Sequence, residues 1–208
     1  MQDSDIILAK SIVTRFSHDM AGVVSAVSNS LSLLEDLGGG DEETIKLATD
    51  NAAILMGRLR FFRAAFGNEG PLSDIAVTQK IFEDYLKTLE NKIVRYSCSW
   101  MTDGELPIFV FRQILIAGMI VAETLPRGGS VSVQALAGNR QIRIEAQGKT
   151  VQIDSQIQSA LEGTVSDNEV SPKIMPAVFL KKYADEQKWE ISVVVSDEKA
   201  VMLLKEKR

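Results

Sequence analysis

Side chains with strong nucleophilic or metal-binding chemistry are scarce in this sequence: its 208 residues include one cysteine, Cys98, and one histidine, His18. A lone cysteine excludes a disulfide within the chain and favours a reducing compartment. No apolar run is long enough to span a bilayer, and the acidic first five residues are unlike a signal peptide. A formal net charge of −5 gives no reason to expect nucleic-acid binding. We therefore expect a soluble, cytoplasmic protein that binds neither nucleic acid nor membrane.

The first third of the chain has the periodicity of two long helices. One is expected from Ser4 or Asp5 to just before the three glycines at 38–40, and the other from about 42 to about 67. In each helix, residues spaced three and four apart form an apolar seam. The first seam is Ile6, Ala9, Val13, Phe16, Met20, Val23, Val27, Ser30, Leu34 and Leu37, and the second is Ile45, Ala48, Ala52, Leu55, Leu59, Phe62 and Phe66.

Two such helices joined by a tight turn form an antiparallel hairpin. Further apolar residues at Ile12, Val24 and Leu31 widen the stripe beyond what one partner helix covers. A symmetric dimer would bury the remainder in a four-helix bundle. We predict a homodimer through residues 5–67, and we assign residues 1–70 to this hairpin domain.

His18 is the residue from which a function can be argued. A neutral imidazole in solvent is a nucleophile, and Asp19 can hydrogen-bond one ring nitrogen and leave the other free to attack phosphorus. The alternative is a solvated surface histidine with no role, which its position alone would favour. The predicted seam places His18 on the opposite face, together with Ser11, Arg15, Gly22, Ser25 and Asn29. We interpret His18 as a phosphorylatable residue and Asp19 as its catalytic neighbour.

Gly22 lies one helical turn after His18. A glycine costs a helix interior about 1 kcal/mol relative to alanine. It also removes side-chain bulk beside the imidazole, which would suit an approaching partner; the alternative is close packing between helices. We predict that Gly22 and the following Ser25 belong to a partner-binding face.

Four arginines fall near the level of His18. Arg15 lies one turn before it, and a rise of about 1.5 Å per residue puts Arg58, Arg60 and Arg63 at the same height on the second helix. These arginines either form a solvated basic face or help to receive an acidic partner or a phosphoryl group. We predict the second role for all four.

Residues 71–208 have the pattern of alternating helices and strands, with Gly138-Asn139 as a tight turn. Helices are expected at about 73–89, 107–125, 154–161 and 173–187, strands at 92–100, 131–137, 141–147, 189–195 and 200–205, and a loop at 164–171. This order favours an α+β sandwich, a mixed sheet with helices on one face.

A helical hairpin followed by such a sandwich is the layout of a histidine kinase core. The stretch Phe16-Ser17-His18-Asp19-Met20-Ala21-Gly22 resembles the phospho-acceptor box of dimerising kinase domains. With the residues at 29–34, it looks most like the ChpT family of alphaproteobacterial histidine phosphotransferases, over essentially the whole chain. The stretch 125–131 is similar to the helix-to-strand joint of the kinase ATP-binding domain.

The second domain departs from an active kinase at three places. The helix before Pro126 should carry two asparagines for Mg²⁺-ATP, but the nearest equivalents are Ala117 and Val121. The aspartate-glycine box that reads adenine is replaced by residues 145–149 (Glu-Ala-Gln-Gly-Lys), and the glycine-rich phosphate loop is replaced by residues 170–175. Because these groups are missing, we expect no ATP, no other cofactor and no metal of the chain's own.

The resemblance implies a phosphorelay intermediary that shuttles a phosphoryl group between receiver-domain aspartates through His18. It further implies that the donor is the receiver of a hybrid kinase, that the acceptors are response regulators, and that Mg²⁺ is supplied by the receiver. Three alternatives remain open: a divergent ATP-dependent histidine kinase, a non-catalytic dimeric adaptor on a kinase-like scaffold, and an anti-sigma-type regulator.

Overall fold

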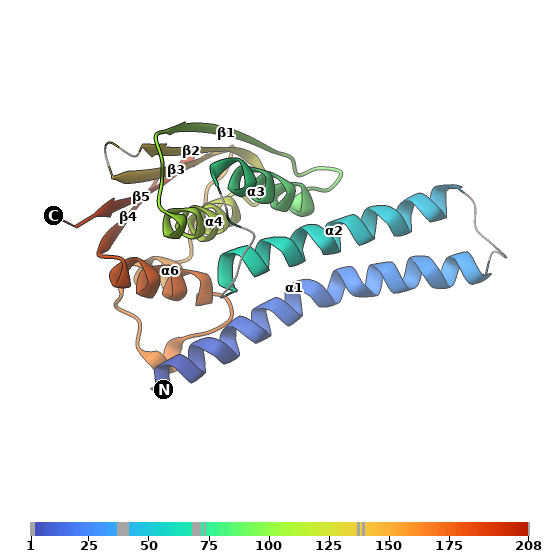
Figure 1. The fold of residues 1–208 in the computed structure, drawn as a ribbon. Helices are drawn as coiled ribbons and strands as arrows, with labels where there is room; N and C mark the ends of the chain where they lie inside the picture. Colours follow the sequence, from blue (N-terminus) through green and yellow to red (C-terminus); the bar gives the residue numbers. More distant parts are fainter. Residues whose placement is uncertain are drawn as a thin grey trace.

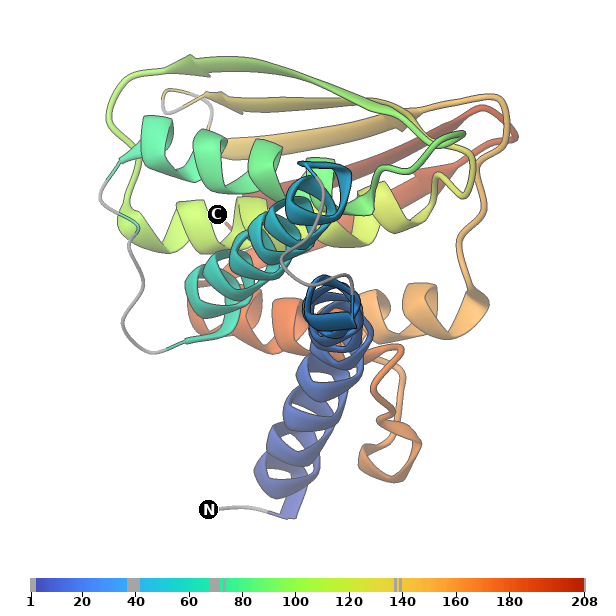
Figure 2. The ribbon, with the colours of Figure 1, turned by 90° about the vertical axis from the view of Figure 1, so that its right-hand side faces the viewer.

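The fold combines two long helices with a five-stranded sheet covered by helices on one face, as the sequence predicts (Figures 1 and 2). The computed structural model describes residues 3–36, 42–67, 72, 74–136, 138 and 140–207. Helices α1 (Asp3–Asp36) and α2 (Glu42–Phe66) form the hairpin. The turns expected at 38–40 and 68–71, the cap candidate Ser73, and Asn139 of the expected tight turn lie outside the described residues.

The remaining elements form the sandwich. They are α3 (Ile75–Leu89), β1 (Tyr96–Asp103), α4 (Ile108–Glu123), β2 (Gly129–Leu136), β3 (Gln141–Gln147), α5 (Ser155–Glu162), the short 3-10 helix η2 (Asp167–Glu169), α6 (Met175–Glu186), β4 (Trp189–Val195) and β5 (Lys199–Glu206). The strand order is β1-β2-β3-β5-β4. Strands β1 and β2 are parallel and the other pairs are antiparallel, so the sheet is mixed. Helices α3, α4 and α6 lie between the sheet and the hairpin (Figure 1).

Helix α4 is the centre of the core, because 12 of its 16 residues are buried. The sheet presents every second side chain to it, which is the period-two pattern of a strand with one covered face. These inward residues are Val131, Val133 and Ala135 of β2, Ile142, Ile144 and Ala146 of β3, and Ala200, Met202 and Leu204 of β5. Full burial of one such large apolar side chain stabilises the fold by about 1.5–3 kcal/mol.

Several helix ends follow signals that are visible in the sequence. The Asp74 carboxylate accepts a hydrogen bond from the Val77 amide at 2.8 Å and begins α3. Asp154 does the same for the Gln156 amide at 2.8 Å and begins α5. Gly163, with φ of 76°, ends α5 in the left-handed conformation that glycine adopts without strain. The short helix predicted for residues 154–161 is therefore confirmed.

Two boundaries in the sandwich were predicted wrongly. The first strand lies at 96–103 rather than 92–100, because the Asn91 side chain folds the preceding residues into a turn. Its Oδ1 accepts hydrogen bonds from the amides of Ile93 at 2.9 Å and Val94 at 3.0 Å. The expected loop at 164–171 also contains η2, which a capping box between Ser166 and Glu169 stabilises.

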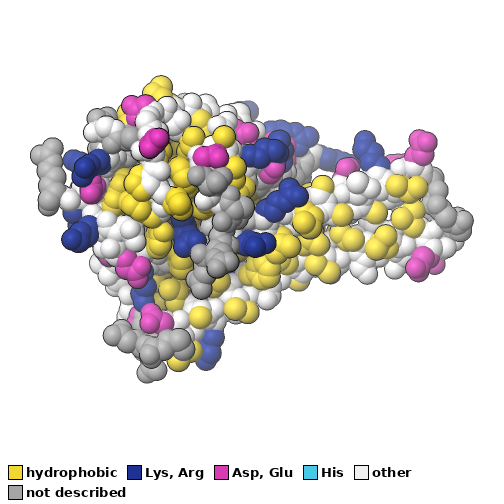
Figure 3. Space-filling view, viewed as in Figure 1, with side chains coloured by type: hydrophobic (Ala, Val, Ile, Leu, Met, Phe, Trp, Pro, Cys, Tyr) yellow, Lys and Arg dark blue, Asp and Glu magenta, His cyan; other side chains and the backbone are white. Residues whose placement is uncertain are grey.

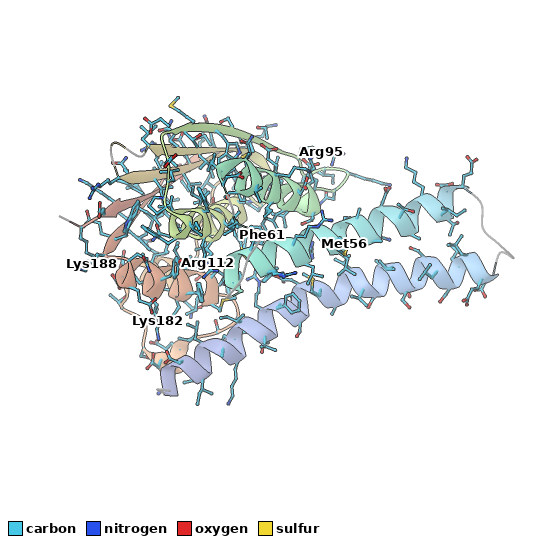
Figure 4. All side chains as sticks on the ribbon, viewed as in Figure 1. Met56, Phe61, Arg95, Arg112, Lys182 and Lys188 are labelled. Carbon is cyan, nitrogen blue, oxygen red and sulfur yellow. The ribbon has the colours of Figure 1, made fainter. Side chains whose placement is uncertain are left out.

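The seam predicted for α1 is wrong at its N-terminal end. Val13, predicted to be covered, is 63 % exposed, whereas Ser11, predicted to face outward, is buried. The reason is that this half of α1 packs against α6 as well as against α2. Lys182 of α6 extends toward the start of α1 (Figure 4) and its Nζ lies 3.7 Å from an Asp5 carboxylate oxygen.

Aromatic rings join the base of the hairpin to the sandwich. Phe62 of α2 contacts Phe16 of α1 edge-to-face, with ring centroids 5.6 Å apart, and Phe66 contacts Phe179 of α6 at 5.3 Å. Phe61, seen where α2 passes beneath α4 in Figure 4, is fully buried and stacks on Tyr85 at 3.8 Å. One hydrophobic core thus continues across the boundary between residues 1–70 and 71–208, while the rest of the hairpin projects beyond the sandwich (Figure 1).

Within the described part of the chain, none of the helices combines the length and the apolar character that crossing a membrane requires.

Candidate functional site

His18 lies in the middle of α1, and its side chain is 87 % exposed. Its exposure follows from the rotation of the helix: Phe16, Met20 and Val23 turn toward the interior and leave His18 on the outer side. The imidazole is therefore open to a macromolecular partner, as the sequence predicts.

Asp19 connects the imidazole to the interior. One carboxylate oxygen, Oδ1, lies 3.3 Å from His18 Nδ1, and the other, Oδ2, accepts a hydrogen bond from Arg15 Nε at 2.8 Å. An ionised carboxylate can only accept hydrogen bonds, so the Nδ1 contact favours the tautomer with the proton on Nδ1. That tautomer leaves the Nε2 lone pair directed away from Asp19, as a nucleophile requires.

Arg15 does not lie on the free outer face on which its sequence spacing placed it. Its side chain is 18 % exposed and bridges two carboxylates, with Nε on Asp19 and Nη2 on Glu123 at the end of α4. Glu123 was not predicted from the sequence, because the ion pair joins residues 108 positions apart and no local pattern marks it. Arg15 is thus a contact between the hairpin and the sandwich within one chain.

The charges at this junction influence one another. Loss of solvent alone would lower the pKa of Arg15, but Glu123 and Asp19 outweigh it and raise that pKa. The pKa of Glu123 is also raised, because loss of solvent outweighs the opposing effect of Arg15. Burial likewise raises the pKa of the neighbouring Tyr85 hydroxyl, with Glu123 adding to it. Tyr85 is therefore a neutral group beneath an ionic cluster.

Arg58 is at the predicted height but is engaged within the chain. Its Nη1 donates a hydrogen bond to the backbone carbonyl of Asp19 at 2.8 Å, and its Nη2 donates to the carbonyl of Thr88 at 3.2 Å. The side chain thereby ties the His18 turn of α1 to the end of α3. This geometry gives Arg58 a structural role in addition to the predicted partner contact.

The other predicted partner-binding residues lie at the surface. Arg63 and Ser25 are exposed, and Arg60 lines a groove of about 470 Å³ between α2 and α3. Gly22 is exposed, and a Cβ atom added to it would meet no atom within 4 Å. Within one chain, close packing therefore does not account for this glycine.

A cleft of about 650 Å³ opens at the C-terminal end of α4. Ile120 lines it, whereas Ala117 and Val121, the expected equivalents of the metal-binding asparagines, are buried in the core. Across the cleft, Asp154 is paired with Lys173. Among the described residues, no group of three histidine, cysteine or acidic side chains is placed to hold a metal ion.

Comparisons with known proteins agree with this arrangement. The chain is 24 % identical over 199 residues to the protein phosphotransferase ChpT of Brucella abortus (strain 2308), and the alignment covers 93 % of each protein. A solved structure entitled "1.7 Angstrom Structure of a Bacterial Phosphotransferase" has the same fold, with a TM-score of 0.82, 23 % identity and coverage of 99 % of this chain and 98 % of that one. A family model described as "Histidine phosphotransferase C-terminal domain" matches residues 76–199. Because that match spans more than half of the 208 residues, the chain belongs to the histidine phosphotransferase family.

Proposed function

We propose that this chain is the phosphohistidine intermediate of a phosphorelay, with His18 accepting a phosphoryl group from a receiver-domain aspartate and passing it to another. The observation that carries the proposal is the exposed imidazole of the chain's single histidine, whose Nδ1 lies 3.3 Å from Asp19 Oδ1. Membership of the family and the similarity to a protein named phosphotransferase support it.

The chemistry is an in-line displacement at phosphorus. The Nε2 lone pair forms the N–P bond while the bond from phosphorus to the receiver's aspartate oxygen breaks, and the aspartate leaves as a carboxylate. The ring then carries a positive charge, with its proton on Nδ1. Asp19, 3.3 Å away, stabilises that charge and so acts as an orienting catalytic neighbour.

The receiver is proposed to bring Mg²⁺ and to dock on the face around His18. Small side chains follow the imidazole along α1, namely Ala21, Gly22 and Ser25, and all three are exposed. The smooth strip they form would let another protein's surface approach Nε2 closely. Arg60 and Arg63 on α2 are the two predicted arginines that remain exposed for an acidic partner.

We also propose that two copies pair through the hairpin. Three of the exposed large apolar side chains of α1 share one face, Val13 at 63 %, Val24 at 50 % and Leu31 at 51 % exposure. At about 100° of rotation per residue they lie within about 20° of one another, forming a stripe about 120–140° from His18. Pairing through this α1 stripe would therefore leave the imidazole free.

Helix α2 has a matching stripe. Ile45, Met56 and Leu59 are 49 %, 46 % and 41 % exposed and lie within about 60° of rotation. Each stripe is about 90° from the side facing the other helix, in the same rotational sense, so in an antiparallel pair both lie on one side of the hairpin. Figure 3 shows hydrophobic side chains along the length of the hairpin. A mass of one 22.9 kDa chain in light scattering at micromolar concentration would contradict the dimer.

An ATP-dependent kinase is the less favoured candidate. In kinases of this layout, carboxamides on the helix before the joint at 125–131 bind the metal, whereas here Ile120 and Glu123 of α4 and the following Thr124 line the cleft. We propose that the cleft has no role in ATP-driven phosphorylation. Labelling of His18 after incubation with radiolabelled ATP and Mg²⁺ alone would contradict this.

The decisive experiment is phosphotransfer from a purified receiver domain carrying radiolabelled phosphate on its aspartate. The wild-type chain is expected to become labelled, with the acid-labile, alkali-stable behaviour of phosphohistidine, and His18→Gln is expected to remain unlabelled. Asn29→Gln is a suitable control, because residue 29 is also exposed on α1 and lies about 16 Å along the helix from His18. Labelling of His18→Gln at the wild-type rate would refute the proposal.

A further inference from the structure

A chain of charged contacts leads from the end of α4 to the imidazole of His18. Glu123 is paired with Arg15 Nη2, Arg15 Nε donates to Asp19 Oδ2 at 2.8 Å, and Asp19 Oδ1 lies 3.3 Å from His18 Nδ1. Three of these residues lie within one turn of α1, whereas Glu123 belongs to the sandwich. Glu123 is therefore a carboxylate of the sandwich that reaches the His18 turn of the hairpin through Arg15.

The two carboxylates divide one edge of the guanidinium between them. Nε and Nη2 point the same way, and this edge is the one that arginine uses to bind both oxygens of a single carboxylate. Here Asp19 occupies only Nε, because Glu123 occupies Nη2. The second oxygen of Asp19 is consequently left for His18.

The surroundings of Arg15 favour this arrangement, in which Asp19 binds Nε and Glu123 binds Nη2. The side chains of Arg15 and Asp19 are 18 % and 20 % exposed, so water screens their interaction less than it would at an open surface. Arg58 donates a hydrogen bond to the backbone carbonyl of Asp19 at 2.8 Å and so restrains this turn of α1. In contrast, the His18 ring is 87 % exposed and makes one weak contact, so its tautomer depends on where Asp19 Oδ1 points.

From these contacts we infer that Glu123 is a positioning residue for phosphotransfer: by occupying Arg15 Nη2 it keeps Asp19 Oδ1 on His18 Nδ1 and holds Nε2 unprotonated for attack. The inference rests on the proposed function, since it assigns a remote residue to the same reaction. Without the Glu123 charge, Arg15 is free to take both oxygens of Asp19 in a bidentate pair. The imidazole then loses its acceptor, and the tautomer protonated on Nε2, which cannot attack phosphorus, gains population.

The test uses the fact that His18 is the only histidine, so every imidazole signal in an NMR spectrum of the natural sequence belongs to it. In ¹⁵N-labelled protein at a pH where the ring is neutral, the two nitrogen shifts report the tautomer fractions. We expect Glu123→Gln to lower the fraction protonated on Nδ1 relative to wild type. Arg15→Lys keeps the positive charge but removes the guanidinium edge that Asp19 and Glu123 share. It is expected to change the fraction protonated on Nδ1 as well.

Transfer from a phosphorylated receiver is measured on the same proteins. At saturating receiver, Glu123→Gln is expected to slow labelling of His18 about tenfold. This is far less than the roughly 10⁴-fold loss when a buried triad aspartate is replaced, because the Asp19 contact is long and exposed. The receiver concentration at half-maximal rate should stay unchanged, since Glu123 is not one of the residues proposed to contact the receiver. Glu190→Gln on β4 removes an equal charge outside the cluster and should match wild type in every measurement.

Wild-type tautomer fractions and rate in a folded Glu123→Gln variant would overturn the inference. So would a rise in the half-maximal receiver concentration with no change in tautomer, because that result would make Glu123 a docking residue. If the wild-type chain accepts no phosphoryl group, the proposed function fails. In that event the NMR measurement still decides whether Glu123 determines the tautomer of the His18 imidazole.

Discussion

The hairpin and the sandwich differ in how much of their apolar surface is buried. In the sandwich, α4 buries 12 of its 16 residues, and the inward side chains of three strands are covered. In the hairpin, α2 buries only five of its 25 residues, and most of those lie where it meets the sandwich. Met56, on the part of α2 that is farther from the sandwich (Figure 4), is 46 % exposed.

Because of this difference, most of the buried core that stabilises the fold lies in the sandwich, whereas the proposed chemistry takes place on the hairpin. The sandwich covers its own hydrophobic surface within one chain, whereas the hairpin leaves two apolar stripes exposed, through which we propose that a second copy pairs. His18, the proposed nucleophile, lies on the incompletely covered region, between the α1 stripe and the sandwich. A partner protein can therefore reach His18 without opening a core.

The two potential nucleophiles of the chain offer the largest contrast between the regions. Burial raises the pKa of the Cys98 thiol on β1 to about 12, and the nearby Glu83 adds to the shift. For a thiol, a raised pKa means less thiolate at any lower pH. Against an ordinary pKa near 8.5, we expect alkylation of Cys98 by iodoacetamide at pH 8 to be about a thousandfold slower than that of a free thiol.

The control for that measurement is the same protein in guanidinium chloride, where Cys98 should react at the rate of an ordinary thiol. Fast alkylation under native conditions would show that β1 opens readily and that the sandwich is not the closed region described above.

Leucine-to-alanine substitutions compare the two regions by stability. Leu180 of α6 is fully buried, whereas Leu33 of α1 is 44 % exposed and lies outside the α1 stripe. We expect Leu180→Ala to lower the free energy of unfolding by about 3 kcal/mol, through lost burial and the cavity it leaves. Leu33→Ala is expected to change it by less than about 0.5 kcal/mol. Urea denaturation followed by circular dichroism measures both, and equal losses would contradict the comparison.

Sequence periodicity predicted most of the elements but not how they meet. The bounds of α2, β3 and α5 were predicted to within about a residue, because caps, glycines and local alternation determine them. Ser11 and Val13 were misplaced because the packing of α1 against α6, in addition to α2, does not show in the heptad pattern of α1. The candidate site was half predictable for the same reason: the contact between His18 and Asp19 follows from their adjacency, but the pair of Arg15 with Glu123 depends on tertiary packing.

A pair of leucines on α1 tests the proposed dimer. Leu31 lies in the α1 stripe, and Leu33, two residues on, points about 160° away from it, with a similar exposure of 44 % against 51 %. Leu31→Glu places two charges in the proposed interface and is expected to weaken association tenfold or more. Leu33→Glu carries the same change and should leave the dimer intact. Sedimentation equilibrium measures both, and equal behaviour of the two variants would argue against pairing through this stripe.

The smallest expected effect concerns Gly22, where stability and function should move in opposite directions. Glycine in a helix interior costs about 1 kcal/mol relative to alanine, and an added Cβ would meet nothing within 4 Å, so Gly22→Ala should stabilise the hairpin by up to about that amount. The same methyl group would lie one turn from the imidazole, on the face where the receiver is proposed to dock. We expect phosphotransfer to slow a few-fold.

Ser32→Ala is the matched control, because it also improves helix propensity at an exposed α1 position but lies about 21 Å along the helix from His18. It should raise the melting temperature slightly and leave the transfer rate unchanged. If Gly22→Ala gains stability with no loss of rate, docking of the receiver does not require a glycine at residue 22. If it instead lowers the melting temperature, the second copy must pack against Gly22, and the dimer interface then extends beyond the α1 stripe toward His18.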